Sequence, residues 1–151
     1  EYRLNYMWPH NARSKLKIKK EFDENVAILK IFPGINQQTV ESIFNIKGLR
    51  GVVLETYGSG NTMNFPWFIK SLQKAIKKEI IIYNVSQCSG GEVIQGRYET
   101  SKRLNDIGVL SGGDITTEAA ITKLMFLLGT EKSLDEVRKK LVIPLNGEMD
   151  N

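Results

Sequence analysis

Three short, nearly continuous apolar runs divide the first part of the chain, and each is followed by a polar or glycine-rich segment. Runs of this length without alternation are typical of strands covered on both faces, as in a parallel sheet. They cover residues 26–31, 51–55 and 80–85. Leu16–Lys20 differs, because its apolar residues alternate with lysines, and this period predicts a half-buried edge strand. A further short strand end is expected at Val109-Leu110.

Helical patterns separate these strands. Asn36 is a suitable N-cap, Pro66 suits a first helical turn, and Ser133-x-x-Glu136 is a capping box. Strands that alternate with helices predict an α/β fold, here a Rossmann-like three-layer domain with a small parallel sheet and right-handed crossovers. The helices are expected at Gln37–Ile46, Phe65–Lys78, Ser101–Ile107, from Asp114–Thr116 to Leu128, and from Ser133 onward.

The same pattern divides the chain into three parts. Residues 1–24 are expected to hold an interdomain linker and the edge strand, because residues 1–14 show no periodicity. Residues 25–143 form the α/β domain. Residues 144–151 are expected to be a frayed tail.

Composition narrows the class of protein. The chain has 151 residues, of which 41% are hydrophobic and 25% charged, as expected for one soluble globular domain. No stretch approaches the roughly 20 apolar residues of a membrane span, and the first ten residues lack a signal pattern. We therefore expect no membrane partner. The single cysteine, Cys88, excludes an internal disulfide and favours the cytoplasm, and the single histidine, His10, argues against histidine-based catalysis or metal binding.

The net charge of +4 is concentrated in residues 1–20, which hold six basic residues against one acidic residue. A basic footprint confined to one terminal segment does not favour a nucleic-acid face. A solvated strand face explains it better, and we expect no nucleic-acid partner.

Parallel sheets of this type bind ligands at the carboxyl ends of their strands. That rule selects two loops, Glu55–Asn61 and Ser86–Gly91. Gly58, Ser59, Gly60 and Asn61 could surround an anion with backbone N–H groups, or could form an ordinary turn that needs positive φ at its glycines. Cys88 has no predicted base beside it, so a ligand-contacting or buried cysteine is preferred to a nucleophile. The residues alone do not define a reaction.

Five blocks resemble, in the same order, the C-terminal domain of type I L-asparaginases. They are Ala27–Gly34, Gly51–Asn61, Asn84–Cys88, Gly96–Glu99 and Gly108–Leu124. The resemblance implies hydrolysis of L-asparagine to L-aspartate and ammonia without a metal or organic cofactor. It also implies an N-terminal asparaginase domain as partner and a homodimer or homotetramer.

In that family the nucleophilic threonine belongs to an N-terminal Thr-Gly-Gly-Thr block, and a Thr-Asp pair and a lysine assist it. These blocks do not occur in the chain, and Thr116-Thr117 are assigned to a helix start. The chain supplies no catalytic residue by this comparison, and we expect it to be inactive alone.

The resemblance also suggests roles for the two loops. Gly58–Asn61 matches the loop that approaches the active site of a neighbouring subunit, with Asn61 toward the substrate, although Met63 stands where periplasmic relatives have a second asparagine. Ser86, Gln87 and Cys88 match part of a regulatory asparagine site. Glu55 replaces an arginine of that site and would repel the carboxylate of the ligand.

Two alternatives to an asparaginase remain open. One is the corresponding domain of the glutamyl-tRNA(Gln) amidotransferase subunit, of the archaeal type, that supplies ammonia for transfer-RNA charging. The other is a free-standing small-molecule-binding module.

Overall fold

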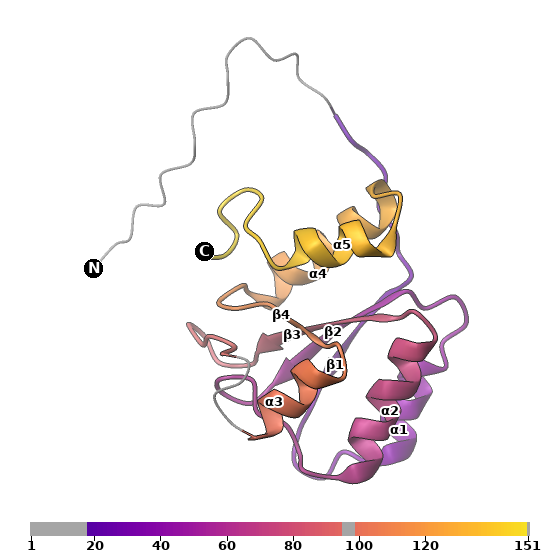
Figure 1. The fold of residues 1–151 in the computed structure, drawn as a ribbon, viewed down its shortest axis with the longest axis vertical. Coiled ribbons are helices and arrows are strands. Elements are labelled where there is room, and N and C mark those ends of the chain that lie inside the picture. The colour runs from indigo at the N-terminus through magenta and orange to yellow at the C-terminus, as the bar shows by residue number, and fades with distance from the viewer. Residues whose placement is uncertain (1–17, 95–98, 151) are drawn as a thin grey trace.

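The computed structural model describes residues 18–94 and 99–150, and the side chains of residues 99–101 lie outside the description. Helices and strands alternate over most of this length (Figure 1). In chain order the elements are β1 (Val26–Lys30), α1 (Gln37–Phe44), β2 (Gly51–Thr56), α2 (Pro66–Lys77), β3 (Ile81–Ser86), α3 (Glu99–Asp106), β4 (Leu110–Ser111), α4 (Thr117–Thr130) and α5 (Leu134–Leu141).

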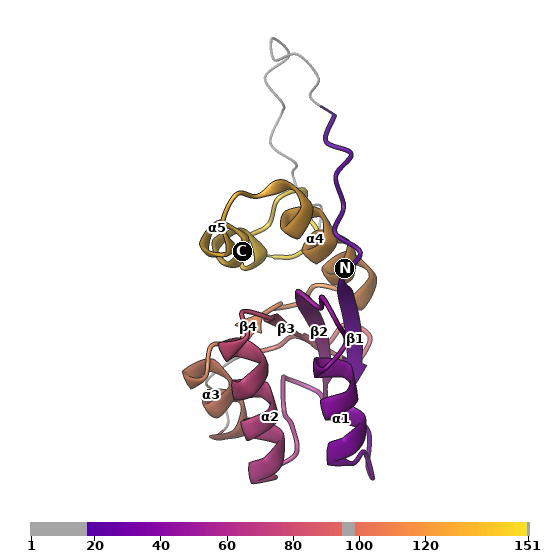
Figure 2. The same ribbon diagram turned by 90° about the vertical axis from the view of Figure 1, so that its right-hand side faces the viewer.

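The strands form one parallel sheet in the order β1-β2-β3-β4. Every residue of β2 and of β3 is buried, which explains why their sequences are apolar on both faces. Figure 2 shows α1, α2 and α3 on one face of the sheet and α4 and α5 on the other. The predicted α/β fold with three layers is therefore confirmed.

Each face of the sheet has its own apolar core. Leu54 and Ile82 point toward α1 and α2, where they pack with Phe68 and Leu72. The intervening residues of the same strands belong to the second core, under α4 and α5. Complete burial of one such side chain contributes roughly 1.5–3 kcal/mol, so the two cores hold the three layers together.

Several local signals act as the sequence predicts. The Asn36 side chain caps α1 by accepting a hydrogen bond from the Thr39 N–H at 2.9 Å. Pro66 is the first residue of α2. Ser133 accepts from the Glu136 N–H at 3.3 Å at the start of α5. These contacts satisfy N–H groups that a helix terminus leaves without intrahelical partners.

The predicted edge strand at Leu16–Lys20 is wrong where the structure describes it. Residues 16 and 17 lie outside the described residues, residues 18–20 are not in a strand, and Ile18 is 70% exposed. An alternating pattern gives a strand only where a neighbouring strand supplies hydrogen bonds, and the described sheet ends at β1. The chain instead runs along α4, where the Asp23 N–H donates to the Met125 carbonyl at 3.0 Å.

The expectation of a frayed tail is also wrong for residues 144–150, whereas Asn151 lies outside the described residues. Glu148 forms an ion pair with Lys123 of α4 at 2.7 Å, and Met149 is only 8% exposed. The missed signal is Lys123 itself, because a charge on an apolar, buried helix needs a partner.

Candidate functional site: loops at the carboxyl edge of the sheet

The loop after β2 closes into a tight turn. Tyr57 and Asn61 exchange two backbone hydrogen bonds of 2.9 Å and so form an isolated antiparallel bridge. We call Tyr57–Asn61 the β2 loop. Asn61 also makes an interaction beyond these backbone bonds. The sequence left open whether this loop binds an anion or is an ordinary turn. Both structures would have this backbone conformation, so the geometry of the loop does not choose between them.

Position 60 in the β2 loop requires a glycine, both for its backbone conformation and for the close approach of its neighbours. Its φ is +98°, a region that residues with a Cβ rarely adopt. A Cβ at this position would lie 2.9 Å from Cγ1 of Val93 and 3.4 Å from Nδ2 of Asn84. The Ile94 N–H also donates to the Ser59 carbonyl at 3.2 Å. The β2 loop therefore rests directly on residues 93–94 and on β3.

Two buried polar side chains lie beneath this loop. Thr56 donates to Oδ1 of Asn84 at 2.7 Å, and neither residue is measurably exposed. Nδ2 of Asn84 has no hydrogen-bond partner among the described residues. No local signal in the sequence indicates this pair, because each residue lies within an apolar strand and their contact crosses from β2 to β3.

The second predicted loop is tied to the first. Ser86 donates through Oγ to the Gly58 carbonyl at 2.6 Å and accepts from the Cys88 N–H at 3.1 Å. Gln87 donates through Nε2 to the carbonyls of Ile31, at 2.6 Å, and Glu55, at 2.9 Å. Ser86 and Gln87 thus fasten the carboxyl ends of β1, β2 and β3 to one another, while the Cys88 thiol is exposed.

Glu55 lies on a different face from Ser86. Its carboxylate accepts from Thr117 Oγ1 at 2.7 Å, at the start of α4, and lies 3.0 Å from Nζ of Lys30. Side chains alternate along a strand, so Glu55 points to the α4 face whereas Thr56, and with it Ser86, points to the α1–α2 face. The four residues predicted to share a regulatory site are therefore adjacent in backbone but divided between two faces. Lys30 opposes the negative charge that was expected to repel a ligand.

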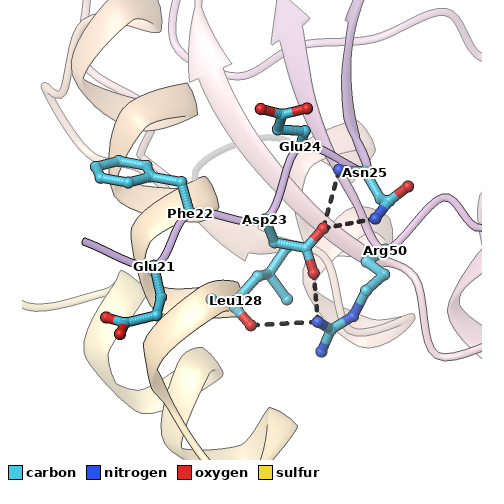
Figure 3. Close-up of a pocket in the computed structure, with 8 residues that line it drawn as sticks. Glu21, Phe22, Asp23, Glu24, Asn25, Arg50 and Leu128 are labelled. Atoms are coloured by element: carbon cyan, nitrogen blue, oxygen red, sulfur yellow. Dashed lines mark hydrogen bonds and ion pairs between the residues drawn. The ribbon is translucent and has the colours of Figure 1, made fainter. Parts of the chain in front are cut away.

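A hollow of about 460 Å³ lies at the opposite, amino edge of the sheet (Figure 3). Asp23 forms an ion pair with Arg50, which also donates to the Leu128 carbonyl at 3.2 Å. Burial alone would raise the pKa of Asp23, but hydrogen bonds from Asn25 and the Arg50 guanidinium lower it. These contacts fix the segment before β1, and they do not involve the loops at the carboxyl edge.

Within residues 18–94 and 99–150, no three His, Cys, Asp or Glu side chains are grouped as metal ligands. In the same residues no helix is long and apolar enough to cross a membrane. His10 and residues 96–98 of the Gly96–Glu99 block lie outside the described residues.

Fold and loops together define an α/β domain whose candidate ligand-facing loops follow parallel strands. Residues 25–141 match the glutaminase/asparaginase C-terminal domain, and the chain belongs to this family. It is 31% identical over 147 residues to L-asparaginase 1 of Escherichia coli K12, a match that covers 97% of the chain and 43% of that protein. It is 37% identical over 136 residues to a glutamyl-tRNA(Gln) amidotransferase subunit of Pyrococcus horikoshii, covering 90% of the chain and 30% of that protein.

Solved structures agree with this assignment. L-asparaginase I of Vibrio cholerae superposes with a TM-score of 0.85 at 32% identity, covering 92% of the chain and 42% of that protein. The thermostable L-asparaginase of Thermococcus kodakarensis gives a TM-score of 0.78 at 29% identity, with 92% and 44% covered. The chain thus spans less than half the length of these relatives, and the resemblance to the C-terminal domain of the asparaginases is confirmed.

Proposed function

We propose that this chain acts as the C-terminal domain of an L-asparaginase, which hydrolyses L-asparagine to L-aspartate and ammonia. The observation that carries the proposal is the family match over residues 25–141, in which the β2 loop occupies the carboxyl edge of the sheet. In this role the β2 loop forms one wall of an active site. The nucleophile comes from a preceding N-terminal domain, and Asn61 faces the substrate.

The contacts of two threonines near the loops support a role without chemistry of its own. Amide hydrolysis needs a nucleophile activated by a base and a site that stabilises the oxyanion. Thr56 is completely buried and donates to Asn84. Thr117 lies on the α4 face and donates to Glu55, whose charge is already opposed by Lys30. Purified alone, the chain is expected to release no ammonia from asparagine above background.

A chimeric enzyme tests the proposal directly. The chain replaces the matching C-terminal region of E. coli L-asparaginase 1, and ammonia release from asparagine is measured. A folded chimera should be active, and Asn61→Ala should lower its kcat/KM by about tenfold or more, through the loss of a polar contact to the substrate side. Asn45→Ala at the C-terminal end of α1 is the matched control and should stay within about twofold. A folded but inactive chimera, or equal losses in both variants, contradicts the proposal.

The similarity to the amidotransferase subunit favours a second candidate, because its 37% identity exceeds the 31% found with E. coli L-asparaginase 1. In that role the same domain would help to release ammonia for transfer-RNA charging. The coding sequence upstream of this chain separates the two candidates. A further domain before the Thr-Gly-Gly-Thr block supports the amidotransferase, and its absence supports the asparaginase.

Regulation by asparagine is a separate proposal, for the region around Glu55, Ser86, Gln87 and Cys88. Lys30 pairs with Glu55 and so offsets the negative charge that would otherwise repel the carboxylate of the ligand. Isothermal titration of asparagine into the chain tests it and also tests the alternative of a free-standing binding module. Heat that saturates at millimolar ligand, and is lost in Lys30→Ala, supports binding at this site, whereas no heat contradicts both ideas.

Assembly into a homodimer or homotetramer with an N-terminal domain is proposed on the exposed apolar side chains. Ile28 on the edge strand β1 and Phe32 just after it are about half exposed. Large apolar side chains gathered at a surface are typical of contact sites. Sedimentation velocity over a range of concentrations should show self-association, and a strictly monomeric profile would contradict this part of the proposal.

A further inference from the structure

The C-terminal segment is held by several contacts to one lysine. Lys123 is 6% exposed, and its ammonium group donates to the carbonyls of Leu141, at 3.0 Å, and Ile143, at 2.6 Å. It also pairs with Glu148 at 2.7 Å. The carboxylate of Glu148 in turn accepts from the Leu145 N–H at 3.0 Å. Residues 145–148 are therefore closed into a turn that is attached to α4.

This attachment brings Met149 and Asp150 to the loop between β4 and α4. Met149 packs in the core under α4, where its Sδ lies 3.9 Å from the Tyr83 hydroxyl. Its Cε is 3.5 Å from the place where Gly113 would carry a Cβ. The Asp150 N–H donates to the side chain of Asp114 at 2.8 Å. In Figure 1 the yellow C-terminal segment lies beside the orange loop that precedes α4.

β4 and the loop that follows it support Val93 through two hydrogen bonds. The Gly113 carbonyl accepts from the Val93 N–H at 2.8 Å, and Ser111 Oγ donates to the Val93 carbonyl at 3.0 Å. Gly113 has no side chain of its own. The space beside it, toward the core under α4, is occupied by the end of the Met149 side chain.

Val93 completes a continuous series of contacts to the β2 loop. Its side chain is 3% exposed and lies against Gly60, closer than a Cβ there would permit. The next residue, Ile94, donates its N–H to the Ser59 carbonyl at 3.2 Å. From the C-terminal segment the series runs through the Asp150–Asp114 hydrogen bond and through Met149, whose Cε lies beside Gly113. It continues through the hydrogen bond from Val93 to Gly113 and reaches the β2 loop at Gly60 and Ser59.

We propose that the C-terminal segment Glu148–Asp150 is a positioning element for the β2 loop, with Met149 as the positioning residue and the Lys123–Glu148 pair as its attachment. The consequence for catalysis rests on the proposed function. The effect on the order of the β2 loop does not rest on that function, because it concerns only how firmly Ser59, Gly60 and Asn61 are held. Packed interiors transmit a local change to neighbouring atoms, since close packing leaves them little room to adjust independently.

Hydrogen exchange measured on the whole chain tests the effect on the order of the β2 loop. In Met149→Ala, the amides of Asn61, Val93 and Ile94 should exchange at least about tenfold faster, because their hydrogen bonds open more often. The amides of α1 and α2 should change by less than about twofold, which separates a local effect from global destabilisation. Met125→Ala is the matched control, since Met125 is also on the α4 side and partly buried but lies outside the series of contacts.

Unchanged exchange at the three amides in Met149→Ala overturns the proposal, and so does an equal increase in Met125→Ala. If Met149→Ala does not fold, Met149→Val serves instead, because it keeps an apolar side chain but lacks the terminal methyl group that reaches Gly113. The same criteria apply to it.

Kinetics of the chimeric asparaginase separate this proposal from the proposed function. A loosened β2 loop should raise the KM for asparagine by several-fold with a smaller change in kcat, because substrate binding needs the ordered loop. Faster local exchange together with an inactive chimera would preserve the positioning role and reject the function. An active chimera in which Met149→Ala changes neither hydrogen exchange nor kinetics would support the proposed function and reject the positioning role.

Discussion

The substitution Glu148→Gln should destabilise the fold strongly although it changes one atom type near the C-terminus. The glutamine keeps the size of the side chain but removes the negative charge that faces the buried ammonium of Lys123. One of its terminal atoms becomes a donor. The glutamine therefore cannot accept both from the Lys123 ammonium, which pairs with Oε1, and from the Leu145 and Asn146 N–H groups, which share Oε2. Removal of one partner of a buried ion pair leaves the other charge uncompensated.

The magnitude follows from the titration of Glu148. Burial by itself would raise its pKa, but the hydrogen bonds from Lys123 and from backbone N–H groups lower it from 4.5 to about 2. At 1.36 kcal/mol for each pKa unit, the ionised carboxylate stabilises the folded state by roughly 3 kcal/mol. Burial lowers the pKa of Lys123, so part of this gain offsets the cost of burying the lysine.

The pH dependence has a definite sign. The carboxylate is ionised in both folded and unfolded chains above the unfolded pKa of 4.5, so its full contribution is present there. Below that pH the unfolded state binds a proton more readily than the folded state. The contribution therefore declines as the pH falls from about 4.5 to about 2. The stability difference between the two proteins should shrink over the same range.

Urea unfolding followed by circular dichroism measures the effect. At pH 7 the free energy of unfolding of Glu148→Gln should be about 3 kcal/mol lower than that of the original chain, a large part of the stability of a domain. Asp135→Asn is the matched control, because Asp135 is 83% exposed in its pair with Arg138 and should cost less than about 1 kcal/mol. Equal losses in the two variants, or a loss in Glu148→Gln that does not diminish toward pH 2, would refute the assignment of a buried pair.

Two further predictions concern other contacts. Gly129→Ala places a Cβ 2.8 Å from the carbonyl oxygen of Glu21, so the segment before β1 should detach from α4. Trypsin should then cleave after Lys20 faster than in the original chain, and an unchanged rate of cleavage contradicts this. Tyr83→Phe removes a 2.8 Å hydrogen bond to the Leu141 carbonyl and should lower the free energy of unfolding by about 1 kcal/mol. Burial raises the pKa of Tyr83, so absorbance titration should show one tyrosine that resists ionisation and is missing in this variant.

The two loops at the carboxyl edge show which features of the candidate site can be predicted from sequence patterns. The rule for parallel sheets selected both loops as ligand sites, and that choice stays a prediction. The structure shows that the two loops are neighbours, because Ser86 joins them through the Gly58 carbonyl. The pattern did not show that Gln87 is committed to two carbonyls or that Glu55 and Ser86 face opposite sides of the sheet. Hydrogen-bond partners depend on the register between strands, and that register is a property of the paired strands together.

The Thr56–Asn84 pair illustrates the same limit. A polar residue in an apolar run reads as an interruption of the pattern, whereas in the sheet two such residues meet and hydrogen-bond. Their pairing became visible only when β2 and β3 lay side by side. The sequence offered one usable clue, because a buried polar side chain needs a partner.

The sequence by itself determined the order of helices and strands, their caps and the three-layer class, because periodicity and capping act between residues close along the chain. It also carried the blocks by which the asparaginase C-terminal domain is recognised. Tertiary structure alone decided the two chain ends. Ile18–Lys20 form no strand because the described sheet offers no neighbour beyond β1, and residues 144–150 are ordered because Lys123, on a helix much earlier in the chain, needs the charge of Glu148. Both outcomes depend on partners that are distant in sequence, which no local pattern encodes.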